Sequence, residues 1–141
     1  MMKNVLIKIT GKQGIGEDTD SIELTTVGKM GIKEGKFLLT YDESELLGVK
    51  GIKTSLMIKD DDTVVLQRSG GYTSRLVVQK GIRNSCFYST PHGDLLIGIF
   101  GEAVSHNLSE KGGTVNMSYT IDSNLQLISR NSVEINVSLS Q

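Results

Sequence analysis

Alternation of apolar and polar residues is the dominant pattern along this chain. It is clearest at residues 5–9, 37–43, 54–58, 115–121 and 133–139, where every second side chain points to the same face of an extended segment. Such alternation indicates strands with one buried face and one wet face. The pattern is typical of antiparallel sheet rather than of strands separated by crossover helices.

Turn signals separate these segments at short intervals. They include the glycine pairs 70–71 and 112–113, the aspartates 60–62 and the Thr-Pro-His-Gly stretch at 90–93. The signals divide the chain into about ten short strands, as in a sandwich or barrel. Helix is expected only as single turns around residues 44–47 and 105–110.

The expected fold is therefore all-β. We predict an antiparallel up-and-down β-barrel of about eight to ten strands, because closing a meander removes its exposed edges. Composition agrees, since the 141 residues include 16 glycines and Ala103 as the only alanine. Alanine favours helix, whereas β-branched residues favour strands. The length fits a single domain over residues 1–141.

Charge and cysteine content narrow the function classes. The formal net charge is −1 with both signs interspersed, so no nucleic-acid partner is expected. The apolar run at 5–9 is too short for a signal peptide, and no run reaches the length of a membrane span. We therefore expect a cytoplasmic protein without a membrane partner. Cys86 is the only cysteine, which excludes an intrachain disulfide, and no metal or other cofactor is expected.

The segment VVLQRSGGYTSRLVV, residues 64–78, raises the main chemical question. If Gly70–Gly71 is a two-residue hairpin loop, Leu66 faces Arg75. Arg68 and Arg75 then lie diagonally on one face of the hairpin. Both faces are mixed in polarity, so the sequence leaves open which one is interior.

A second group of polar residues lies on the apolar face of residues 37–43. Tyr41 and Glu43 share that face with Phe37 and Leu39, and they would approach the rim of a barrel interior. Together with two inward arginines they would form a ligand-binding site for a small carboxylate, phosphate or amphipathic anion. The alternative is a structural ion pair at the barrel mouth, or arginines on the solvated face.

Several short motifs resemble the YwiB-like family, a bacterial family of unknown function with a calycin-like barrel. They are Tyr41-x-Glu43, Gly48, Thr54, Arg68-x-Gly70, Pro91-x-Gly93 and Gly113 followed by Tyr119. Val78 stands where this family would lead us to expect an aromatic residue. The resemblance implies a lipocalin-like barrel of cytosolic type and no established activity. By analogy with ligand-binding calycins, it implies that Tyr41, Arg68 and Arg75 hold a ligand carboxylate.

Three functions remain open at this stage. The first is a barrel that binds a small anionic or amphipathic molecule through Arg68, Arg75, Tyr41 and Glu43. The second is a structural or protein-interaction barrel whose interior is plugged and holds no ligand. The third is an enzyme with Glu43 as base, which we disfavour because no nucleophile, base and orienting group occur together. The oligomeric state is also open, a homodimer included.

Overall fold

A computed structural model describes residues 2–15, 18–42, 53–59, 63–69, 74–90 and 93–139 of the chain. These residues form ten strands and, within these ranges, no helix. The strands are β1 (Met2–Ile15), β2 (Asp18–Lys33), β3 (Lys36–Asp42), β4 (Lys53–Lys59), β5 (Thr63–Ser69), β6 (Ser74–Gln79), β7 (Arg83–Thr90), β8 (Gly93–His106), β9 (Gly112–Ser123) and β10 (Gln126–Leu139). The helical turn expected at residues 105–110 is wrong, because β8 runs to His106 and a loop follows.

The ten strands form a closed antiparallel barrel in meander order. Each strand pairs with its neighbour in sequence, and β1 pairs with β10 from Val5–Leu139 to Gly14–Arg130. The predicted fold class is confirmed. The predicted helical turn at residues 44–47 lies outside the described residues.

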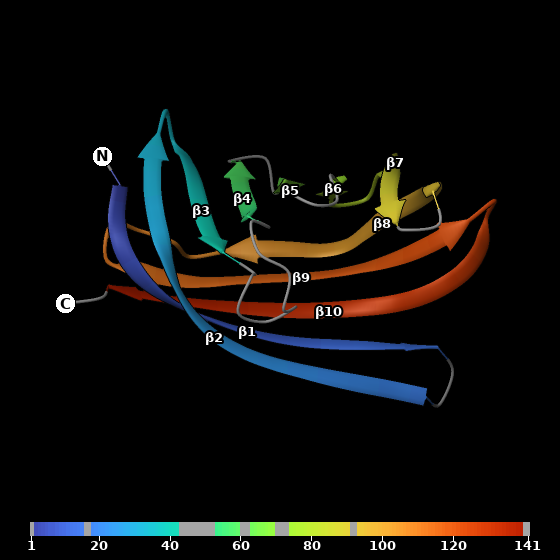
Figure 1. Cartoon of the computed structure of the whole chain (residues 1–141), viewed down its shortest axis with the longest axis horizontal. Coiled ribbons are helices and arrows are strands. Elements are labelled where there is room, and N and C mark those ends of the chain that lie inside the picture. The colour runs from blue at the N-terminus through green and yellow to red at the C-terminus, as the bar shows by residue number, and fades with distance from the viewer. Residues whose placement is uncertain are drawn as a thin grey trace.

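The barrel wall consists of long and short strands (Figure 1). Strands β1, β2, β8, β9 and β10 have 12 to 16 residues and curve along one side of the molecule. Strands β3 to β7 have 6 to 8 residues and complete the wall. The tips of β1 and β2 extend well past the shorter strands, so the interior is less covered at that end (Figure 1).

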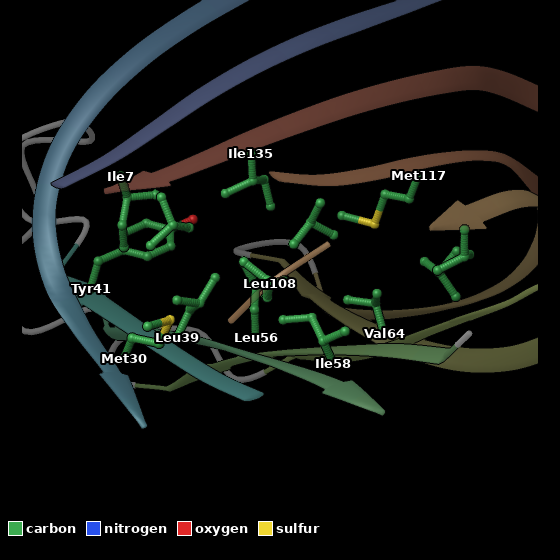
Figure 2. Close-up of a cluster of buried hydrophobic side chains, with 14 of the residues drawn as sticks. Ile7, Met30, Leu39, Tyr41, Leu56, Ile58, Val64, Leu108, Met117 and Ile135 are labelled. Atoms are coloured by element: carbon green, nitrogen blue, oxygen red, sulfur yellow. The ribbon is translucent and has the colours of Figure 1, made fainter. Parts of the chain in front are cut away.

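Aliphatic side chains pack the interior away from those tips (Figure 2). Ile7, Leu39 and Val64 are fully buried, as the alternation predicts. Leu108, from the loop between β8 and β9, is 8% exposed and belongs to the same cluster. Cys86 is also buried in it, as expected for a small apolar side chain. Burial of such side chains contributes roughly 1.5–3 kcal/mol each.

The wall is weakest between β6 and β7, where Ser74–Tyr88 is the single residue pair within the described parts of the two strands. Two other contacts hold this region. The turn that follows β6 is bonded to β8 through Gly81 N–H and the Gly101 carbonyl, 2.8 Å apart. Arg83 also reaches over Gly98 to form a bidentate ion pair with Asp122, with N–O distances of 2.9 and 2.6 Å. The hydrogen bonds from Arg83 hold the pKa of Asp122 below its usual value.

Candidate functional site

The inward-facing positions change from apolar to polar along several strands. On β1 the inward series runs from Val5 through Ile9 to Gln13, and on β10 it runs from Val137 to Asn131. On β5 it ends at Arg68. Because Gln13 pairs with Asn131, the polar ends of β1 and β10 meet. The barrel therefore has an apolar end and a polar end.

Cross-strand pairing arranges the inward polar residues in two rows. The first row crosses the short strands as Tyr41, Thr54 and Arg68, each paired with the next. The second row crosses the long strands as Tyr119, Asn131, Gln13 and Asp20. Asn131 also donates to Ser129 Oγ at 3.0 Å, and Ser129 is buried.

A cavity of about 440 Å³ lies at the polar end. Its aliphatic lining is Ile9, Ile22, Leu66, Leu76, Ile121 and Val133. Its polar and charged lining is Lys12, Gln13, Asp20, Arg68, Tyr119 and Asn131. A volume of this size falls within the range of roughly 300–1,000 Å³ found for small-molecule sites.

The prediction that Arg68 and Arg75 share a face is wrong. In the β5–β6 pairing Leu66 faces Leu76, Gln67 faces Arg75 and Arg68 faces Ser74. The register differs by one residue from that expected with Gly70–Gly71 as a two-residue loop, and such a slip moves a side chain to the opposite face of the sheet. Arg75 is consequently exposed on the outer surface, whereas Arg68 is partly buried and lines the cavity.

The other two predicted site residues have different outcomes. Tyr41 faces the interior as expected, but it is 8% exposed and packs within the apolar cluster beside Ile7 (Figure 2). A glycine at position 28 makes room for both side chains, because a Cβ there would lie 2.8 Å from Ile7 Cδ1. Glu43 lies outside the described residues, so its predicted role is not tested.

Thr54 stands between Tyr41 and Arg68 in the first polar row. Its side chain is fully buried, and its hydroxyl has no hydrogen-bond partner within the described structure. A buried hydroxyl without a partner usually destabilises a protein by about 1–3 kcal/mol. The first row thus places a buried hydroxyl, without a hydrogen-bond partner among the described residues, next to Arg68, the arginine that lines the cavity.

The described residues offer little support for metal chemistry. They contain no group of three or more histidine, cysteine, aspartate or glutamate side chains placed to hold an ion. His106 is the last residue of β8, and it packs edge-on against Phe37 with ring centroids 5.7 Å apart. Its Nδ1 accepts a hydrogen bond from the backbone N–H of Leu108. His92 lies outside the described residues. No helix capable of spanning a bilayer was found among the described residues.

The fold and cavity define a class of protein: a calycin-like antiparallel barrel, packed at one end and hollow at the other. Residues 7–135 match the family described as Domain of unknown function (DUF1934), and the chain belongs to that family. Its structure is similar to the crystal structure of the ywiB protein from Bacillus subtilis, with a TM-score of 0.86 and 18% sequence identity. That match covers 99% of this chain and 94% of the other. At this identity the likeness shows the fold alone. No curated protein sequence matches the chain significantly.

These comparisons confirm the YwiB-like resemblance inferred from the short motifs. The second polar row was not foreseen, although the sequence holds its signal. In residues 5–13 and 131–137 the inward set of an alternating strand turns from aliphatic to amide side chains. Two strands that change in this way and then pair place their amides together.

Proposed function

We propose that the protein binds a small amphipathic anion in the cavity at the polar end of the barrel. Arg68 would hold the anionic group, and the aliphatic lining would cover the apolar body. The supporting observation is that the partly buried Arg68 lines a cavity of about 440 Å³. Half of the other residues that line this cavity are aliphatic.

The chemistry of the lining favours this class of ligand over a fully polar one. A guanidinium offers several N–H donors in a planar fork that fits a carboxylate or phosphate. Tyr119 and Asn131 lie on the facing row and offer further hydrogen bonds. Arg75 has no part in this proposal, because it lies on the outer face, and Tyr41 contributes through packing.

The cellular setting that we propose is the cytosol. The one cysteine of the chain, Cys86, is a buried thiol within the interior cluster. Disulfide-free chains are usual in reducing compartments. The barrel needs no disulfide to stay closed, because ten residue pairs join β1 to β10.

The proposal is tested with anilinonaphthalene sulfonate (ANS), a fluorescent apolar probe that carries one anionic group. We expect Arg68→Gln to raise the Kd for ANS about tenfold or more, since a hydrogen bond to a charged group contributes roughly 1.5–3 kcal/mol. Arg75→Gln is the matched control, because it removes the same charge from the outer face of the same hairpin. We expect this control to bind ANS as the wild type does.

Competition then identifies the ligand class. Decanoate should displace ANS from the wild type, whereas the neutral decanol should displace it much less. A third variant, Val133→Phe, fills the cavity from a different strand and should also reduce ANS binding. Equal ANS binding by Arg68→Gln and Arg75→Gln, or equal displacement by the acid and the alcohol, would contradict the proposal.

A further inference from the structure

A row of apolar residues crosses the outer surface of the barrel, and none of its members lines the cavity at the polar end. The register pairs Met2 with Gly31, Gly31 with Leu38, Leu38 with Met57, Met57 with Val65 and Val65 with Val77. We call these six residues, from β1 to β6, the outer stripe. Their neighbours in each strand, such as Leu39, Leu56 and Val64, point inward and are buried. The stripe therefore places apolar groups where a solvated face is expected.

Part of the outer stripe is hollow and accessible. A cavity of about 410 Å³ is lined by Met2, Gly31, Leu38 and Met57, with Phe37 beside them. Met2 is 42% exposed and Met57 is 36% exposed, so this apolar surface is open to a partner. Gly31 is covered by the thioether of Met2. Methionine side chains adapt their shape to a partner surface, which suits a binding site. Figure 1 shows the strands concerned, β1 to β4, side by side at one end of the molecule.

Positive charge borders the stripe on both sides. On one side Lys33 pairs with Lys36, and Lys59 is on the next strand. On the other side the polar row includes Lys29 and Arg75. Among the described residues, neither flanking row contains an acidic side chain, and Glu34, in the turn between β2 and β3, is the one acid that lines the cavity. None of these five cations forms an ion pair in the part of the chain that the structure describes. Like charges directly opposite each other on paired strands are destabilising, so the Lys33–Lys36 pair is not explained by stability.

We propose that the outer stripe is a docking surface for an acidic amphipathic helix of a partner protein. Strands β1 to β5 are hydrogen-bonded on both sides, so an incoming peptide cannot extend the sheet there and must bind through side chains. A helix satisfies its own backbone hydrogen bonds. From Met2 to Met57 the stripe spans three strand spacings, about 14 Å, which matches about ten helical residues. Acidic residues beside the apolar face of that helix would meet the flanking lysines.

A protein helix fits these features better than a lipid surface does. Membrane-binding faces present protruding apolar side chains to the bilayer. Here the apolar surface is recessed: Gly31 and Val65 are buried, Val65 being 7% exposed. The hollow is lined by outward residues of the stripe together with Ile32 and Phe37 at the ends of β2 and β3. A recess receives the protruding side chains of a helix, spaced at positions i, i+3, i+4 and i+7.

The test uses two fluorescein-labelled helical peptides of about fourteen residues, with leucines at the i, i+3, i+4 and i+7 positions. One peptide has glutamate at the remaining positions and the other has lysine. In fluorescence anisotropy the glutamate peptide should bind the wild type at least tenfold more tightly than the lysine peptide. Met57→Glu should weaken binding of the glutamate peptide at least tenfold. Leu96→Glu, at an outward-facing site on β8 that is 55% exposed, is the matched control and should bind as the wild type does.

A charge-reversal variant gives an independent readout that does not depend on the apolar contact. Lys33→Glu with Lys36→Glu changes two exposed side chains, and it should reverse the preference so that the lysine peptide binds more tightly. Several results would overturn the proposal: equal binding of both peptides to the wild type, no effect of Met57→Glu, or an unchanged preference in the double variant. Binding of the wild type to vesicles containing anionic lipid but not to the glutamate peptide would also overturn it, as would self-association that Met57→Glu abolishes.

Discussion

At the scale of single residues, Thr54 is an inward polar group whose hydroxyl the described surroundings do not satisfy. It is a β-branched residue near the start of β4, which suits the extended backbone, and its side chain is fully buried. Its hydroxyl, however, has no partner within the described structure. Thr114 offers a contrast, because its hydroxyl donates to Asn136 Oδ1 at 2.9 Å.

These two threonines predict opposite effects of the same substitution. Thr54→Val keeps the shape and removes an unsatisfied hydroxyl, so the free energy of unfolding should rise by about 1 kcal/mol or stay unchanged. Thr114→Val breaks a formed hydrogen bond and should lower it by about 1 kcal/mol. Urea unfolding followed by circular dichroism measures both. Equal destabilisation by the two variants would mean that the Thr54 hydroxyl has a partner in solution.

At the scale of elements, β8 organises the weak side of the barrel. Its two glycines, Gly98 and Gly101, leave space on opposite faces of the strand for groups from elsewhere. The guanidinium of Arg83 lies over Gly98 on its way to Asp122. The backbone of Gln79 and Lys80 lies against Gly101, which exchanges hydrogen bonds with Gly81 and Ile82. The Gly101 contacts thus tie the turn between β6 and β7 to β8, and the Arg83 contact ties β7 to β9, beside the sparsely paired β6–β7 junction.

Gly101→Ala should therefore destabilise the protein by roughly 1–3 kcal/mol, the usual effect of overpacking. A Cβ at this position would overlap the carbonyl group of Gln79 and lie 3.0 Å from Lys80 N. Gly11→Ala is the matched control, because its Cβ would meet nothing closer than the Ser132 carbonyl oxygen at 4.0 Å. Its effect should stay within about 0.5 kcal/mol. Thermal melting compares the two, and equal Tm losses would refute the close contact.

At the scale of the whole molecule, the pairing of β1 with β10 joins the two ends of the described chain. Residues such as Ile7 and Val137 are more than a hundred positions apart in sequence, yet they face each other in the closed barrel. Loop-closure entropy opposes contacts of this kind, so the barrel should fold more slowly than a helical protein of the same length. Because every strand of the closed barrel is paired on both sides, we expect the ten strands to unfold together.

Ile7→Ala should consequently lower the stability of the entire barrel rather than loosen β1 alone. Ile7 is fully buried, and Ile→Ala at such sites reduces the free energy of unfolding by about 2–5 kcal/mol. Urea unfolding should remain a single transition, shifted to a lower midpoint, whether it is followed by far-ultraviolet circular dichroism or by tyrosine fluorescence. Two separated transitions in the variant would show that β1 detaches independently.

Most of the fold could be predicted from sequence. Alternation with period two is a local property, so it identified the inward faces of residues 5–9, 54–58 and 133–137 without knowledge of strand neighbours. The gradual change from aliphatic to polar residues on those faces also predicts a polar end. The outer stripe was not predicted, because outward residues of different strands form a row only after their register is known.

The sequence by itself determined that the chain forms a meander of antiparallel strands, because each strand carries its own pattern of buried and exposed positions. The tertiary structure decided which arginine lies inside. A shift of one residue in the pairing of β5 with β6 moves Arg75 from the inner to the outer face of the sheet. Both faces of that hairpin are mixed in polarity, so the sequence pattern does not choose between the two pairings. The choice depends on how Leu66, Leu76 and the neighbouring strands pack together, which is a property of the closed barrel.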